Sequence, residues 1–286
     1  MRDVTTLAAP ALEGRRTGTA GASKARAWIT QQFTDTGLIP TNGSRFDQPF
    51  TFTARGNRAS RSGGTPNGAE HPPANVVGRL PGTDSRSPTF VITAHYDHVG
   101  IRDGVVYPGA DDNASGVAVL LAAARHFTMH RPRHTMLFAA LDAEETGQHG
   151  AKALVASTLL PPGRTRLNVN IDMVSRSNAN EIYAAGPYYS PWLMPLLREV
   201  QGRSSVKILF GHDRPANAAG GLEDWTHSSD HGAFHDAGVP FVYFGVEDHR
   251  DYHKPTDTAD RIDPRFFGDA ADMIVEAIRT FDARLD

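Results

Sequence analysis

Cysteine is absent from this chain of 286 residues. Disulfide bonds, thiolate catalysis and cysteine-ligated zinc sites are therefore excluded. No apolar run approaches the ~20 residues that a membrane-spanning helix needs, so we expect no membrane span. Residues 1–6 lack the apolar stretch of a signal peptide, so we expect that any such peptide is absent from this chain.

A strong net charge is also missing. The 29 Lys and Arg residues against 32 Asp and Glu residues give a formal net charge of −3, which removes the usual electrostatic argument for a nucleic acid as the main partner. Residues 54–74 are rich in Gly, Pro, Arg, Ser and Asn without apolar periodicity, and they predict a flexible excursion rather than a linker between domains. We therefore expect a single domain over residues 1–286.

Short apolar segments alternate with amphipathic helical patterns along the chain. Helical spacing predicts helices near residues 21–37, 117–124 and 192–200, and a last helix that Asp263 caps and Pro264 opens. Strands are expected at residues 76–80, 90–94, 136–141, 169–173, 181–184, 206–210 and 240–244. This alternation indicates an α/β fold, with three α-β-α layers around a central mixed, mostly parallel sheet.

Polar residues gather where the expected strands end, which is where functional residues of such sheets collect. The clusters are His95-Tyr96-Asp97-His98, Asp111-Asp112-Asn113 before a helix, Glu144-Glu145, Asp172, and residues 248–257 with His253. Taken singly, each has an ordinary explanation as a core histidine, a helix cap, a solvated acidic pair or a surface turn. A metal site explains all five together.

The candidate ligands are carboxylates and imidazoles, a set that suits zinc or a similar divalent ion. A carboxylate shared by two ions is the usual arrangement in two-metal hydrolases. His95 needs a partner that fixes its tautomer, and Asp97, two residues along an extended strand end, projects to the same side. Of Glu144 and Glu145, one can bind a metal while the other accepts a proton from water. The residues thus favour a two-metal hydrolytic site and leave these two glutamates open.

The ordered motifs resemble those of the bacterial leucyl aminopeptidase family of dizinc exopeptidases. They are His-x-Asp at 95–97, Gly-Ala-Asp-Asp-Asn-Ala-Ser-Gly at 109–116, Glu-Glu at 144–145, Ile-Asp-Met at 171–173 and His-x-Pro-Thr-Asp-Thr at 253–258. Residues 12–19 and 75–82 also look like segments of that family. The resemblance spans roughly residues 7–280 and implies the zinc exopeptidase (phosphorylase/hydrolase-like) fold, here without a protease-associated or lid domain.

The resemblance implies two zinc ions per chain, although other divalent metals suit the same ligands. One ion would be held by His95, Asp112 and Asp172. The other would be held by Asp112, Glu145 and His253, so that Asp112 bridges the pair. Peptides with a free N-terminus would be the substrates.

The resemblance also implies the catalytic roles. Glu144 would be the general base that takes a proton from the zinc-activated water and passes it to the leaving amine, and Asp97 would orient His95. His98, His231 and His249 match no ligand position of the family, so we expect them beside the ligands or at the surface.

Three residues are candidates for a substrate pocket. Met173 and Tyr252 each adjoin a predicted ligand, and Phe244 ends the last expected strand, so together they favour an apolar first side chain. We further expect a monomer that is exported to the periplasm or secreted, with a cytoplasmic location left open.

Three alternatives share parts of this pattern. A glutaminyl cyclase has the same fold but typically one zinc ion, and it would not need both His95 and Asp172. A non-catalytic binding ectodomain of the same fold would have lost the ligands, all of which are present here. A two-metal phosphoesterase would suit the ligand types, but no Lys or Arg cluster accompanies the motifs.

Overall fold

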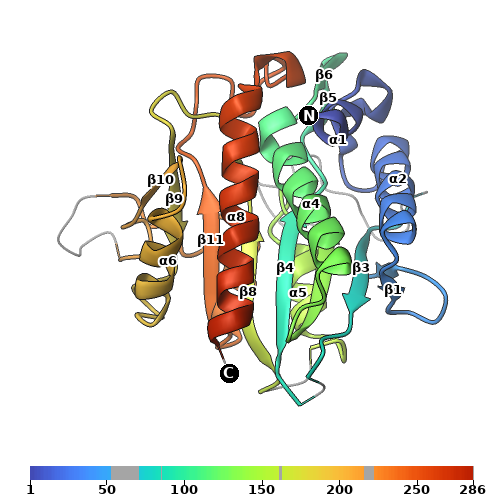
Figure 1. Cartoon of the computed structure of the whole chain (residues 1–286). Helices are drawn as coiled ribbons and strands as arrows, with labels where there is room; N and C mark the ends of the chain where they lie inside the picture. The colour runs from blue at the N-terminus through green and yellow to red at the C-terminus, as the bar shows by residue number, and fades with distance from the viewer. Residues whose placement is uncertain (53–70, 85, 161–162, 216–221, 286) are drawn as a thin grey trace.

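The computed structural model describes residues 1–52, 71–84, 86–160, 163–215 and 222–285 (Figure 1). Within them nine strands form one sheet, in the order β1-β3-β7-β4-β8-β11-β9-β10, with β2 also paired to β3. Their bounds are β1 (Ile39–Pro40), β2 (Asp47–Pro49), β3 (Ala74–Leu80), β4 (Thr89–His95), β7 (Thr135–Leu141), β8 (Thr165–Ile171), β9 (Glu181–Ala185), β10 (Lys207–Leu209) and β11 (Phe241–Gly245). A separate hairpin joins β5 (Gly100–Arg102) to β6 (Val105–Tyr107).

The centre of the sheet is parallel and its flanks contain antiparallel pairs. Strands β7, β4, β8 and β11 are neighbours that pair in parallel. Strand β3 runs antiparallel to β7, and β9 runs antiparallel to β11. The four central strands therefore end at the same edge, and this edge carries the candidate site.

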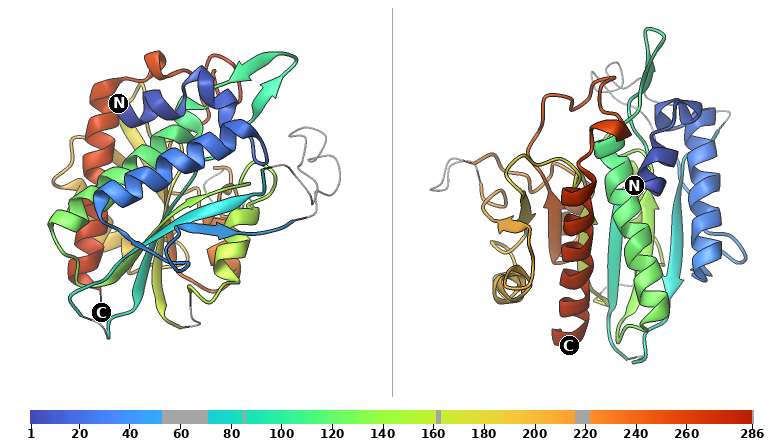
Figure 2. Two further views of the ribbon diagram at one scale, coloured as in Figure 1. Left: turned by 90° about the vertical axis from the view of Figure 1, so that its right-hand side faces the viewer. Right: turned by 45° about the horizontal axis from the view of Figure 1, so that its top comes forward.

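Helices cover both faces of the sheet, which confirms the predicted three-layer α/β fold (Figure 2). One face packs against α1 (Arg2–Leu7), α2 (Ala20–Thr36), α4 (Gly116–Met129), α6 (Leu193–Gln201) and α8 (Pro264–Arg284). The other face packs against α5 (His149–Val155) and α7 (His231–Asp236). In Figure 1 the layer of α2, α4 and α8 lies in front of the sheet.

The last helix shows how local sequence sets an element. The Asp263 side chain accepts hydrogen bonds from two backbone N–H groups of the first turn, and Pro264 occupies the first helical position. Ile274, Ile278 and Phe281 form a fully buried stripe against the sheet. The predicted cap, start and buried face are therefore confirmed.

Strand β8 divides its side chains between the two faces. Val169 and Ile171 enter the apolar core beneath α4 and α8, whereas Asn168 and Asn170 point to the opposite face. There the Asn168 amide donates to the carbonyl of Val91 at 3.2 Å, and the strand stays polar along this row.

Some expectations concern segments outside this description. The excursion expected at 54–74 lies outside the described residues except for 71–74, and Ala74 already begins β3. The short elements α1, α5 and the β5–β6 hairpin were not predicted, since a few residues carry too little periodicity. None of the helices in the described ranges combines the length and apolar character required to cross a bilayer.

Candidate metal centre

The five predicted metal ligands lie together where the parallel strands end. His95 is the last residue of β4, Glu145 follows β7, Asp172 follows β8, and His253 lies in the turns after β11. Asp112 comes from an irregular turn, η2 (Ala110–Ser115), directly before α4. Segments far apart in the sequence converge here because neighbouring parallel strands end at one edge.

Three donor atoms form what we call the His95 cluster, made of His95, Asp112 and Asp172. His95 Nε2 lies 3.4 Å from Asp112 Oδ1 and 3.2 Å from Asp172 Oδ1. Burial lowers the pKa of His95, but the carboxylates of Asp172, Asp97 and Glu144 together outweigh it and raise that pKa well above its usual value. Surroundings this negative favour a cation where the three donors meet.

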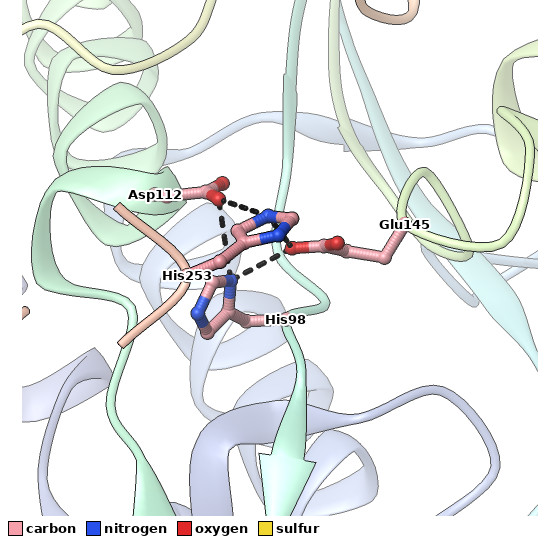
Figure 3. Close-up of side chains that lie close together, drawn as sticks. All are labelled: His98, Asp112, Glu145 and His253. Atoms are coloured by element: carbon pink, nitrogen blue, oxygen red, sulfur yellow. Dashed lines mark ion pairs between the residues drawn. The ribbon is translucent and has the colours of Figure 1, made fainter. Parts of the chain in front are cut away.

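Four donor atoms form the His253 cluster, made of His98, Asp112, Glu145 and His253 (Figure 3). His253 Nε2 lies 3.0 Å from Asp112 Oδ2 and 3.2 Å from Glu145 Oε1. His98 Nδ1 lies 2.8 Å from Glu145 Oε1 and 3.5 Å from Asp112 Oδ2. Figure 3 shows the four side chains pointing toward one another from separate segments.

Asp112 belongs to both clusters and turns a different oxygen to each. Its Oδ1 faces His95, and its Oδ2 faces His253. Buried carboxylates crowded in this way are costly unless a cation compensates their charge. The donor chemistry, without sulfur and with one shared carboxylate, fits two divalent ions of the zinc type.

Asp97 supports the site through two different groups. Its backbone oxygen lies 3.1 Å from His95 Nδ1, whereas its Oδ1 lies 3.7 Å away, so the carbonyl makes the closer contact. This contact places the proton on Nδ1 and leaves Nε2 to the His95 cluster. The Asp97 carboxylate instead accepts the backbone N–H groups of Glu144 at 3.0 Å and Glu145 at 3.3 Å, and the Thr17 hydroxyl at 3.2 Å.

Glu144 belongs to neither cluster, and its side chain lines the cavity above them. Burial raises its pKa well above the usual value; His95 opposes this rise, while the carboxylates of Asp230, Glu145 and Asp172 add to it. A carboxylate with a raised pKa can take up and release a proton near neutral pH, as a general base requires.

Asn113 joins the turn that carries Asp112 to the end of β8. Its Nδ2 donates to the carbonyl of Ile171 at 2.9 Å, and its Oδ1 accepts the N–H groups of Gly116 at 2.9 Å and Met173 at 3.2 Å. These bonds reach the residues on both sides of Asp172. Asn113 therefore links the turn that carries Asp112 to the segment that carries Asp172.

Asp111 lies outside both clusters. It accepts the N–H and the hydroxyl of Ser175 at 2.8 and 2.7 Å, and its Oδ2 lies 3.1 Å from His249 Nε2. The Asp257 carboxylate accepts the N–H groups of Asp111 at 3.1 Å and Asp112 at 3.2 Å. These acidic neighbours shape the turn.

Arg15 holds the same region from the N-terminal side. The side chain is fully buried and donates to four carbonyl oxygens, among them those of Tyr96 at 2.8 Å, Pro108 at 2.6 Å and Gly109 at 2.8 Å. Burial lowers the pKa of Arg15 to about 10. The Arg15 guanidinium thereby links the segment after β4 to the segment before η2. This link is a structural role for the motif at residues 12–19.

Four non-glycine residues around the site have left-handed backbones. They are Ala143 (φ 61°), Gln148 (φ 59°), Met173 (φ 55°) and His253 (φ 52°). Each such conformation costs about 1 kcal/mol or more and persists where the surroundings impose it. Two of these residues, Ala143 and Met173, directly adjoin Glu144 and Asp172.

The clusters open onto a cavity of about 680 Å³. Met173 and Tyr252 line it, as the sequence predicted. Phe244 does not, because it is fully buried in the core under the helices. Successive residues of β11 face opposite sides of the sheet, so its neighbour Tyr243 lines the cavity instead.

The three histidines that were not predicted to bind metal, His98, His231 and His249, have different environments. His98 lies within the His253 cluster, which the sequence did not predict; its place three residues after His95 was the available signal. His249 contacts Asp111. His231 donates from Nε2 to the carbonyl of Trp225 at 2.8 Å, and burial lowers its pKa to about 4.

Known proteins that are similar in sequence to this chain include two peptidases. Aminopeptidase YwaD of Bacillus subtilis is 30% identical over 217 residues, which cover 71% of this chain and 44% of that protein. A probable zinc metalloprotease of Pyrenophora tritici-repentis is 26% identical over 206 residues, which cover 60% of this chain and 41% of that protein. The chain thus spans less than half the length of these two relatives.

Solved structures with the same fold include two of different stated activity. A zinc aminopeptidase from Bacillus subtilis superimposes with a TM-score of 0.71 at 19% identity, covering 99% of this chain and 95% of that one. A glutaminyl cyclase from Bacteroides thetaiotaomicron gives a TM-score of 0.73 at 16% identity, covering 97% and 95%. At such identities the likeness concerns the fold.

The sequence model described as Peptidase family M28 matches residues 75–278, a stretch that runs from β3 into α8 and contains both donor clusters. This match confirms the predicted resemblance to zinc exopeptidases. The chain therefore belongs to peptidase family M28.

Proposed function

We propose that this chain is a metallo-aminopeptidase that uses two zinc ions to hydrolyse the N-terminal peptide bond of peptides. The observation that carries the proposal is the pair of donor clusters that share Asp112. Glu144, which belongs to neither cluster, lines the cavity beside them. When bound, the two ions would acidify a water molecule and polarise the peptide carbonyl.

The residues of the chain would divide the remaining tasks. Asp112 would hold both ions, while His95 and Asp172 bind on one side and Glu145 and His253 on the other. Glu144 would accept a proton from the attacking water and return it to the leaving amine. Its raised pKa, caused first by burial, suits both steps.

Asp97 would act as a positioning residue rather than as a group that touches the substrate. Its carbonyl fixes the tautomer of His95, and its carboxylate holds the backbone of Glu144 and Glu145. Ligand and base would therefore keep a constant relative position during the reaction.

The charge of the cavity supports a preference for a free N-terminus. Besides the ligands, Glu144, Glu223 and Asp248 line the cavity, whereas Arg102 is the lining residue of opposite charge among the described residues. The two divalent ions and the three ligand carboxylates would nearly offset one another, so the remaining acidic side chains would attract an ammonium group. The cavity would therefore bind the α-amino group of the first residue of a peptide.

Apolar side chains provide a place for the side chain of that first residue. Met173, Tyr243, Tyr252 and Trp225 line the cavity beside the clusters. Aromatic and thioether groups favour large apolar partners. We therefore propose substrates with Leu-like or aromatic first residues.

The decisive experiment combines metal analysis with hydrolysis of leucine p-nitroanilide, with and without a chelator. About two zinc ions per chain and chelator-sensitive hydrolysis are expected. Glu144→Gln should lower kcat by about 10²–10⁴-fold while both metals stay bound. A near-normal rate in this variant would refute the assignment of the base.

An assay on a peptide with N-terminal Gln distinguishes the aminopeptidase from the main alternative, a glutaminyl cyclase. Release of ammonia from that peptide, together with one metal ion and no hydrolysis of the anilide, would indicate a glutaminyl cyclase. The presence of donors for two ions favours the peptidase. A chain that binds no metal and hydrolyses nothing would instead be a binding domain of the same fold.

A further inference from the structure

The two donor clusters are unequal. The His95 cluster contains three donor side chains, whereas the His253 cluster contains four, because His98 joins it. A zinc ion with three protein ligands keeps an open position for water or substrate. Four protein ligands fill the usual tetrahedral shell, so that binding a water then requires expansion to five ligands.

Four of the six distances among these donor atoms are known and can be compared with the edges of a tetrahedral shell. With metal–ligand distances of about 2.0–2.1 Å, the edges of a tetrahedron are about 3.3 Å long. The four contacts measure 2.8, 3.5, 3.0 and 3.2 Å between an imidazole nitrogen and a carboxylate oxygen. His98 Nδ1 thus lies about as far from the carboxylates of Asp112 and Glu145 as His253 Nε2 does.

The His98 ring is fully buried, and neither of its nitrogens makes a hydrogen bond in the part of the chain that the structure describes. A buried imidazole normally has a hydrogen-bond partner. Nδ1 sits 2.8 Å from Glu145 Oε1, an ion-pair distance, and this carboxylate is itself one of the donors of the cluster. Lone pairs that converge on a common cation would have this arrangement.

The absence of a side chain at Gly109 makes room for the His98 ring. Gly109 has φ +58°, and a Cβ at this position would lie 2.5 Å from Cγ and Cδ2 of His98. Arg15 holds the carbonyl of Gly109, which packs against the ring, and that of Tyr96, two residues before His98. His98 is not among the residues that line the cavity, so it approaches the cluster from the protein interior.

We propose that His98 Nδ1 is a direct ligand of the ion in the His253 cluster, so that this ion has four protein ligands and is firmly retained. The ion in the His95 cluster is then the exchangeable one, and its open position faces the substrate. This inference rests on the two-metal site of the proposed function and adds a sixth protein ligand to it.

Zinc titration of the metal-free protein, in competition with a chromophoric chelator, tests the asymmetry. The unaltered protein should bind two ions with distinct affinities. His98→Ala should weaken the tighter site by more than about 100-fold, beyond the effect of losing an outer-shell contact, and should leave the other site in place. His249→Ala is the matched control, since it removes another imidazole that contacts a carboxylate, and it should bind both ions as the unaltered protein does.

His98→Asn separates ligation from hydrogen bonding. The Asn amide can still donate to Glu145 from near the Nδ1 position, but it is a poor zinc ligand. A ligating His98 predicts that the Asn and Ala variants lose affinity equally. Retention of the tighter site within about 3-fold in His98→Asn would overturn the proposal.

Direct evidence would come from NMR of the unaltered protein with ¹⁵N-labelled histidine and ¹¹³Cd. Coupling between ¹¹³Cd and Nδ1 of His98 is expected, and its absence while His253 shows coupling would overturn the proposal. This measurement does not depend on whether the variants fold.

The two proposals can fail separately. Coupling at His98 in a protein that hydrolyses no aminoacyl anilide would refute the aminopeptidase and leave the ligand assignment intact. Hydrolysis with two bound ions but no coupling at His98 would do the opposite.

Discussion

Replacement of Asn113 by alanine should damage both the stability and the metal site. The side chain is buried and makes three hydrogen bonds, to the carbonyl of Ile171 and from the N–H groups of Gly116 and Met173. In Asn113→Ala three buried backbone groups lose their partners, at about 1–3 kcal/mol each. Because water can enter the space that is vacated, we take the lower part of this range and expect a loss of about 3–6 kcal/mol.

The loss should be visible in urea unfolding of the metal-free protein as a lower midpoint with an unchanged slope. In thermal unfolding, 3 kcal/mol corresponds to a decrease in Tm of about 6–12 °C. Asn113 directly follows Asp112 and is hydrogen-bonded to both neighbours of Asp172. Zinc binding in the His95 cluster should therefore also weaken, by about 10–100-fold.

Asn168→Ala provides the control. Asn168 is buried on the same strand as Ile171 and donates to Val91 at 3.2 Å and to the Thr93 hydroxyl at 3.0 Å, with no bond to the ligand loops. This variant should lose stability and keep both zinc affinities. Stability of Asn113→Ala within 0.5 kcal/mol of the unaltered protein, or equal loss of zinc in both variants, would refute the positioning argument.

Three further predictions concern the shared ligand, a buried acid and the pocket. Asp112→Ala removes the side chain common to both clusters, so metal analysis should show both ions lost rather than one. Burial and the charge of Asp97 raise the pKa of Asp142 to about 7, so in the metal-free protein the stabilisation from this group is complete below its ordinary pKa and is lost as the pH rises through 7. Urea unfolding at pH 5 and pH 8 should therefore differ by about 2–3 kcal/mol more in the unaltered protein than in Asp142→Asn. Tyr243→Leu should change the KM for leucine p-nitroanilide relative to other aminoacyl anilides, whereas Phe244→Leu should leave this preference unchanged and cost about 1–2 kcal/mol of stability.

Much of the site was predictable because its residues follow strands. The periodicity of the apolar segments located β4, β7, β8 and β11, and the polar residues after each of them pointed to one edge of a parallel sheet. Parallel pairing brings strand ends together whatever the loops do. The cap and the buried face of α8 were equally local, since they depend on spacing within one helix.

The supporting interactions were not predictable in the same way. The sequence places Arg15 81 positions before Tyr96, and no spacing rule states that its guanidinium will hold that carbonyl. Asp97 was expected to orient His95 through its carboxylate, but its carbonyl makes the closer contact, because the chain leaves the strand at that point.

The sequence by itself determined the fold class, the family motifs and the choice of five candidate donors, since these depend on residue type and on distances along the chain. Only the tertiary structure decided that His98 faces Glu145 and that Tyr243, rather than Phe244, faces the cavity. The direction of a side chain depends on strand register and on the path of each turn. Both are set by the packing of segments that lie far apart in the sequence.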